Sequence, residues 1–137
     1  MSSLYLSVQE QMLSGSFDIL EKPISFLLVD DAYAFDTGHE NLDDALNVMT
    51  MSTAGSGVIA EGELVNARIE QGRLVADANL VQPFTSGTVS GVLLLFLEDN
   101  DIDSKLIAYI NQGGFPLEVT GSDISISWGS YIISMGG

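Results

Sequence analysis

The stretch Gly91-Val92-Leu93-Leu94-Leu95-Phe96-Leu97 decides how this chain folds. Its apolar run of six residues, from Val92 to Leu97, is far shorter than the roughly 20 residues needed to span a bilayer. A short, continuous apolar run bounded by turn residues is typical of a strand that is covered on both faces. The sequence therefore predicts a buried strand with other elements packed against each of its faces.

Strand signals continue on both sides of this run. Pro23 precedes the β-branched and aromatic run Ile24–Val29, which predicts a strand. The runs Glu63–Ile69 and Arg73–Asp77 flank Gln71-Gly72, and this pattern predicts a β-hairpin. Further strands are expected at residues 79–84, 105–110, 124–128 and 131–133.

The C-terminal strand region alternates between apolar and polar residues. Ile124, Ile126 and Trp128 fall on one face of a strand, and Ser125 and Ser127 fall on the other. This spacing predicts that Trp128 packs in the core.

The strand and turn signals together predict an all-β chain. About eight short strands, with turn residues every 8–12 positions and hardly any helix, are typical of an antiparallel β-sandwich or jelly roll. We expect one short helix within this sandwich. The sequence contains no internal linker, so a single domain is predicted over residues 17–137, preceded by an arm or short helix over residues 1–16.

The N-terminal segment carries Leu4, Val8 and Met12 at a spacing of four, which predicts a short helix that ends at Ser14-Gly15-Ser16. A helix of about ten residues is marginal alone and must pack against something. It packs either on its own domain or, as an arm, on a neighbouring subunit. Packing on its own domain is favoured, and Leu4, Tyr5, Val8 and Met12 are the candidates for a capsid or subunit contact.

A second helix is predicted after the first strand. Thr37-Gly38-His39-Glu40 fits a capping box that would open a helix running through Leu46. Residues 50–57 are rich in Ser, Thr and Gly and predict a mobile loop. Because methionine adapts to irregular surfaces, Met49 and Met51 are candidates for a second contact surface, with core filling as the alternative.

The charge of the chain excludes two classes of partner. Four Lys and Arg residues against 19 Asp and Glu residues give a formal charge of −15, and the four cations are scattered singly. Binding to nucleic acid or to an anionic membrane surface needs clustered basic residues. The chain also has no cysteine, which excludes disulfides, thiolate metal sites and a cysteine nucleophile.

His39 is the only histidine, so a Ser-His-Asp relay would have to be built around it. It lies among acidic residues at the start of the predicted helix. We expect a structural or surface role for His39 rather than catalysis, with an interface contact as the alternative.

The densest carboxylate cluster is the segment Glu98–Asp103. Asp99, Asp101 and Asp103 match the first ligand positions of a calcium loop, but Ser104 replaces the required glycine and Ile110 the final glutamate. An EF-hand is therefore excluded. A solvated loop tip between two strands is expected, and a loose cation contact stays open.

Two pairs of adjacent carboxylates raise the question of a catalytic dyad. Neighbouring side chains diverge on a strand or a helix, so Asp30-Asp31 is interpreted as a strand end and Asp43-Asp44 as the wet side of a helix. The sequence contains no phosphate-binding loop, nucleophile elbow or zinc spacing. We expect no catalytic residue, no metal and no cofactor.

The order of these segments resembles a family of small capsid cement or decoration proteins encoded among the head genes of tailed bacteriophages. The similarity covers most of residues 18–133 and lies mainly in order and spacing. The matching segments are Ile24–Asp30 leading to Tyr33, His39–Asp43, the hairpin around Gly72 with Leu74, Ala76 and Asp77, Leu106–Ile110, Pro116 and Gly121–Trp128. The N-terminal segment and the link before Val58 depart from the family pattern.

The resemblance implies a jelly roll without catalytic residues, located on the outer surface of a phage capsid after synthesis in the host cytoplasm. The implied partners are the major capsid protein, whose subunits it would bridge, and a second copy of itself, with a dimer favoured over a trimer. The contact candidates Leu4, Tyr5, Val8, Met12, Met49 and Met51 would serve these interfaces. A neck or tail protein and a receptor- or glycan-binding module remain the alternative functions.

Overall fold

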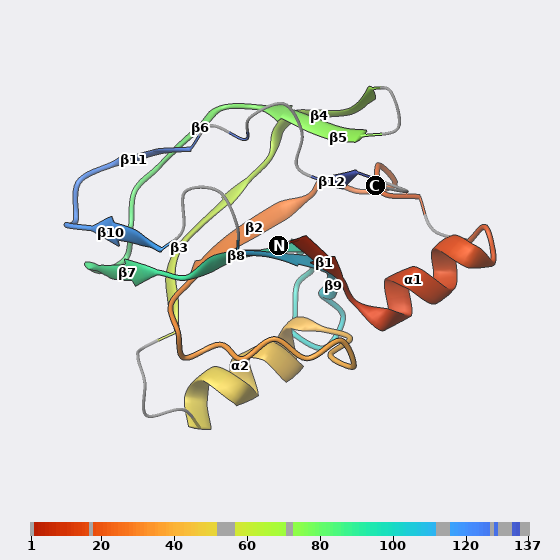
Figure 1. Ribbon diagram of the computed structural model, residues 1–137, viewed down its shortest axis with the longest axis horizontal. Coiled ribbons are helices and arrows are strands. Elements are labelled where there is room, and N and C mark those ends of the chain that lie inside the picture. The colour runs from red at the N-terminus through yellow and green to blue at the C-terminus, as the bar shows by residue number, and fades with distance from the viewer. Residues whose placement is uncertain are drawn as a thin grey trace.

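A computed structural model describes residues 2–16, 18–51, 57–70, 73–111, 116–126, 128 and 133–134. An antiparallel five-stranded sheet lies between two other layers (Figure 1). Its strands, in spatial order, are β1 (Ser2–Leu4), β9 (Lys105–Ile110), β8 (Gly91–Phe96), β2 (Ser25–Val29) and β3 (Val58–Glu63). The predicted apolar run thus forms β8, in the middle of this sheet.

Smaller antiparallel sheets cover one face of the central sheet (Figure 1). One orders β12 (Ile133–Ser134), β5 (Arg73–Asp77) and β4 (Val65–Glu70), a second pairs β11 (Ile124–Ile126) with β6 (Asn79–Val81), and a third pairs β10 (Leu117–Val119) with β7 (Gly87–Val89). Helix α2 (Leu42–Met51) lies on the opposite face, and α1 (Leu6–Leu13) follows β1 at the sheet edge. The described chain is therefore all-β with two helices, as predicted at that level.

Successive residues of β8 enter two separate cores because side chains alternate across a sheet. Val92, Leu94 and Phe96 pack against the smaller sheets, whereas Leu93 and Leu95 pack against α2 and the loop before it. All six β8 residues are buried. This confirms the predicted covering of both faces for Gly91–Phe96, whereas Leu97, also expected in the strand, lies beyond its end and is exposed.

The predicted hairpin is confirmed by the pairing of β4 with β5, in which Ile69 lies opposite Leu74 and Glu70 opposite Arg73. Its expected turn at Gln71-Gly72 lies outside the described residues. Core packing of Trp128 is also confirmed, because its ring meets Phe26 edge-on with centroids 5.3 Å apart. The Trp128 indole N–H donates to the Asn79 side chain at 3.0 Å.

Helix α2 begins later than the sequence predicted. The backbone N–H of Asp44 donates to the Asn41 side chain at 3.2 Å, and the Asp44 carboxylate accepts from the N–H of Glu40 at 2.8 Å. The capping residues are therefore Asn41 and Asp44, and the expected box at Thr37 and Glu40 is wrong. Residues 37–38 instead form a turn in which Gly38 donates to the Asp36 carboxylate. The helix also runs on to Met51, past the predicted end at Leu46.

Several short strands were missed or misjudged in length. β1 has only three residues, two of them serine, and it forms because it can pair with the edge of β9. β6 ends at Val81 instead of Phe84, whose N–H bonds to the Ile59 carbonyl at 2.7 Å. Of the expected final strand at residues 131–133, the structure describes only Ile133, in β12. Residues 52–56 of the predicted loop at 50–57 also lie outside the described part.

Candidate functional site

Aromatic side chains from three parts of the sequence meet where β1 passes into α1. Tyr5 is fully buried and stands immediately before α1. Its ring lies 5.1 Å from that of Phe35, and the rings of Phe35 and Tyr109 stack at 5.7 Å with an angle of 14°. Tyr33 completes the group, with its ring 5.4 Å from that of Tyr109. We call Tyr5, Tyr33, Phe35, His39 and Tyr109 the aromatic cluster.

A chain of hydrogen bonds runs through this cluster. The hydroxyl oxygens of Tyr5 and Tyr33 are 2.5 Å apart, and the Tyr33 hydroxyl lies 2.9 Å from Nδ1 of His39. Burial raises the pKa of Tyr5 far above its ordinary value and raises the pKa of Tyr33 to about 12. Burial also raises the pKa of Tyr109. All three phenols are therefore neutral at physiological pH.

His39 is half-buried within this network. Tyr33 is the only side chain in the described part of the chain that hydrogen-bonds to its ring. Neither a serine hydroxyl nor a carboxylate is paired with the imidazole among those residues, so a nucleophilic relay is not assembled there. The geometry gives His39 a structural contact.

The N-terminal contact candidates differ in their exposure. Tyr5 and Val8 are fully buried within the chain, which removes their side chains from the candidate partner contacts. Leu4 and Met12 are half-buried. The apolar residues that α1 presents to solvent are instead Leu6 and Leu13, the latter 91% exposed, and the stripe at a spacing of four did not single them out.

The two methionine candidates are separated by the end of α2. Met49 is buried in the core beneath the central sheet, where a side chain added at Gly57 would meet its sulfur at 3.2 Å. Met51 is 85% exposed. Core filling, the stated alternative, is therefore the role of Met49, and Met51 alone stays exposed as a candidate contact.

The acidic loop after β8 is closed by its own hydrogen bonds. Asn100 accepts from the N–H of Asp103 and donates to its carboxylate, both at 2.8 Å. Ser104 is buried and bridges the carbonyl of Asn100 to the N–H of Glu98. No group of three or more His, Cys, Asp or Glu residues that could hold a metal ion occurs in the described part of the chain.

The adjacent carboxylate pairs serve the backbone. Asp30 is buried, and its carboxylate accepts from the N–H of Ala32 at 2.8 Å and from that of Gly57 at 3.0 Å. This side chain ties the end of β2 to the start of β3, which the sequence interpretation as a simple strand end missed. Asp43 and Asp44 both lie in the first turn of α2, where carboxylates are favoured by the helix dipole.

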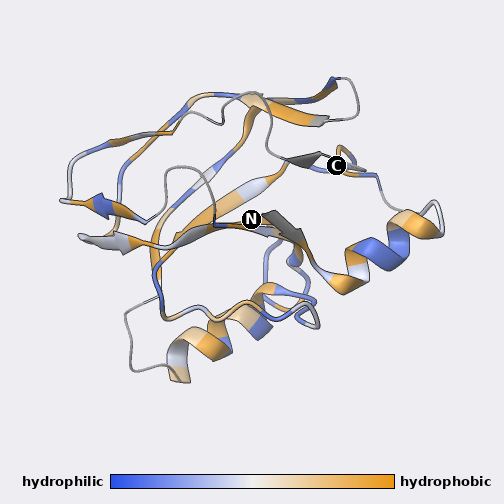
Figure 2. Cartoon of the chain, in the orientation of Figure 1, coloured by the Kyte–Doolittle hydropathy of each residue, from blue (hydrophilic) through white to orange (hydrophobic). Residues whose placement is uncertain are grey.

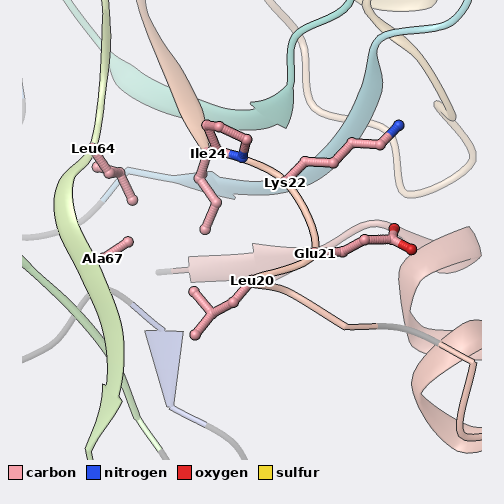
Figure 3. A pocket seen from close by; sticks show the side chains of 7 residues that line it. Leu20, Glu21, Lys22, Ile24, Leu64 and Ala67 are labelled. Atoms are coloured by element: carbon pink, nitrogen blue, oxygen red, sulfur yellow. The ribbon is translucent and has the colours of Figure 1, made fainter.

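An open pocket of about 320 Å³ lies beside β4 (Figure 3). The side chains of Leu20, Ile24, Leu64 and Ala67 point toward its interior, while those of Glu21 and Lys22 extend away from it. Pro23 completes the lining. The pocket is therefore mainly aliphatic, and it offers no set of convergent polar groups for chemistry.

The cationic side chains placed by the structure are already engaged. Lys22 pairs with Glu98 at 2.5 Å, and Arg68 pairs with Glu70 at 2.7 Å and with Asp77 at 3.3 Å. Lys105 lies 3.3 Å from the Ser7 hydroxyl. The unpaired surface charge of these regions is thus predominantly negative. No helix in the described residues is long and apolar enough to cross a membrane.

Comparison with known proteins gives no relative for this chain: no family model, no curated protein and no solved structure matches it.

Proposed function

We propose that this chain is a non-catalytic structural protein of a virus particle, which decorates the outer surface of a phage capsid and bridges its major capsid subunits. The jelly-roll topology implied by the resemblance belongs to the same proposal. The choice of a capsid as partner is supported by the order of the sequence segments, and the physical form of the contact by the surface of the molecule.

A non-catalytic role is supported by how the polar side chains are used. The groups with catalytic potential hold the fold: His39 hydrogen-bonds to Tyr33, Asp30 accepts from two backbone N–H groups, and Asp44 caps α2. Catalysis requires an acid, base or nucleophile within reach of a substrate cavity. The pocket beside β4 is lined mainly by aliphatic side chains.

The observation that carries a contact role is the exposed apolar end of α1. The helix follows the edge strand β1 and extends beyond the sheet (Figure 1), with Val8 as its buried anchor. Leu13, at its far end, is 91% exposed, and Leu6 is 47% exposed. Figure 2 shows apolar ends on α1 on either side of a hydrophilic middle. Apolar side chains on a projecting element are typical of a surface that another protein covers.

The charge distribution indicates the chemistry of that partner. With −15 overall and the described cations already engaged, long-range attraction favours a surface rich in Lys and Arg. Contact with two capsid subunits at once makes the second contact effectively intramolecular, so two modest interfaces suffice for stable bridging. Binding to the assembled lattice alone would stabilise the shell by mass action.

The test is binding to undecorated heads of the phage whose genome encodes the chain. We expect saturable binding of the purified protein and a loss of at least tenfold in affinity for Leu13→Glu, because a charge replaces an apolar contact. Leu80→Glu is the matched control, since Leu80 is 71% exposed on β6 and the substitution changes charge equally. Absence of saturable binding by the unmodified protein would remove the proposal. Equal losses in the two variants would remove α1 as the contact.

A further inference from the structure

The N-terminal segment, residues 2–8, is attached to the body by a small set of contacts. β1 pairs with β9 over three residues, with Ser3 opposite Tyr109. The N–H of Tyr5 donates to the Ile107 carbonyl at 3.2 Å, and that of Leu6 to the Thr37 carbonyl at 2.8 Å. Besides these backbone bonds, Val8 is buried, Leu4 packs against the core and the Ser7 hydroxyl accepts from Lys105. Among residues 4–8, the Tyr5 side chain is the one that enters the aromatic cluster.

Counting hydrogens gives the direction of the bonds from Tyr5 to His39. Tyr33 is the only hydrogen-bond partner of the Tyr5 hydroxyl in the described residues. If Tyr5 donates to Tyr33 and Tyr33 donates to Nδ1 of His39, both phenolic hydrogens are used. In the reverse direction the Tyr5 hydrogen would be buried without an acceptor, which is costly. The favoured arrangement therefore needs a neutral imidazole with an unprotonated Nδ1.

An imidazolium is incompatible with this arrangement because both of its nitrogens are donors. If protonated His39 donates to Tyr33, the direction of both hydrogen bonds reverses and the Tyr5 hydroxyl hydrogen has no acceptor. If the protonated ring turns toward water instead, the Tyr33 hydroxyl hydrogen has no acceptor. We propose that the hydrogen-bonded chain Tyr5–Tyr33–His39 is a pH-sensitive latch, which holds residues 2–8 on the body while His39 is neutral and releases them when His39 takes up a proton.

The number of protons bound in each form decides whether falling pH favours attachment or release. The latched form leaves Nδ1 of His39 unprotonated, whereas the released form lets the ring take up a proton in water, so falling pH favours release. Imidazole is the side chain that ordinarily changes charge between about pH 5 and 8. Carboxylates and ammonium groups ordinarily keep one charge state over most of that range. The titratable groups around the latch are Asp36 and Glu40 beside His39, Asp44 on α2, and Lys105 and Tyr109 on β9.

The inference concerns contacts within one chain and stands apart from the proposed function. Its test uses the single histidine, whose imidazole NMR signals need no assignment among several. With the purified chain, we expect the protection of the Tyr5 and Leu6 amides to fall about tenfold, after correction for intrinsic exchange, with the same midpoint as the His39 titration. The amides of β8 should keep their protection. The latch would be overturned if the protection of the Tyr5 and Leu6 amides stays constant while His39 titrates, or if the β8 amides lose protection in parallel.

His39→Gln is the first control, because its side-chain oxygen can accept from Tyr33 but cannot take up a proton in this range. Its N-terminal protection should not change between pH 8 and 5, and an undiminished fall would contradict the proposal.

A cross-linked variant provides a second control that leaves the latch residues intact. Ser2 lies opposite Ile110 in the β1–β9 pair, and the chain has no cysteine of its own, so Ser2→Cys with Ile110→Cys can form one defined disulfide. The oxidised variant should keep its N-terminal protection at pH 5 and lose it on reduction. If the N-terminal amide protection still falls at pH 5 in the oxidised form, detachment of β1 is not the cause of that fall.

Discussion

The two faces of the central sheet are built from different chemistry, although the same strands supply both. On the face that meets the smaller sheets, Phe26, Leu94 and Val92 belong to a core whose fully buried members are all apolar and non-titratable. On the face that meets α2, Leu93 and Leu95 pack with Tyr5, Tyr33 and Tyr109. The first face is held by burial of apolar surface, and the second adds hydrogen bonds that depend on protonation.

Only the apolar face follows directly from the sequence pattern. The burial of apolar surface has no preferred direction. A buried strand such as Gly91–Phe96 can therefore be recognised from its apolar composition alone. A hydrogen-bonded cluster needs particular atoms from residues far apart in the chain, such as Tyr5, Tyr33 and Tyr109, at one place. The predictions below separate the two kinds of stabilisation, beginning with the largest expected effect.

The largest effect is expected from Leu94→Ala on the apolar face. Leu94 is fully buried, and removing it leaves a cavity that costs about 3 kcal/mol of unfolding free energy. Because the described residues of this core include no titratable side chain, the loss should be the same at pH 6 and pH 8 in urea unfolding experiments. A loss that changes clearly between these pH values would contradict the division between the faces.

A somewhat smaller and pH-dependent effect is expected from Tyr33 on the other face. Its pKa is raised from 10.0 to about 12, so the folded state favours the neutral phenol. The resulting stabilisation is fully present below pH 10 and is lost as the pH rises through 12, with about 1.4 kcal/mol of it lost by pH 11. In urea unfolding between pH 9 and 11, Tyr33→Phe should therefore show a shallower alkaline loss than the unmodified chain. Equal slopes would show that this phenol is not responsible.

The smallest effect is expected at the start of α2, which supports the polar face. Asn41→Ala removes the acceptor for the N–H of Asp44 and should cost about 1 kcal/mol at all pH values tested. Thr37→Ala is the matched control, because the rejected capping box would place the same loss there. If Thr37→Ala is the more destabilising of the two in thermal unfolding, the cap assignment is wrong.

Much of the fold could be predicted, since β2, β8, β9 and the β4–β5 hairpin each carry a local apolar or alternating pattern. β1 could not, because Ser2–Leu4 has no strand signal and pairs only where β9 offers an edge. The start of α2 was misplaced because two capping patterns lie four residues apart, and tertiary bonds select the second: the Leu42 N–H donates to the Ser104 carbonyl.

The candidate site was less accessible to sequence reasoning. Of the predicted stripe Leu4, Val8 and Met12, only Val8 is buried in α1, because Leu4 lies in β1 and Met12 is half-buried, and the most exposed apolar residue of α1 is Leu13. Tyr5 was expected at a partner interface, and it is instead buried against Tyr33. Tyr5 is the one residue between β1 and α1, and nothing in the local sequence indicates that it is buried. Its burial depends on β9, which is distant in sequence and lies beside it only in the folded sheet.

The proposed decoration of a capsid is tested most directly by a cryo-electron microscopy reconstruction of the virion that carries this chain. The proposal predicts density for the chain at regular positions over the whole outer shell, with α1 against the capsid surface between major capsid subunits. Density confined to a ring at the neck or along the tail, or a shell without the chain, would contradict it.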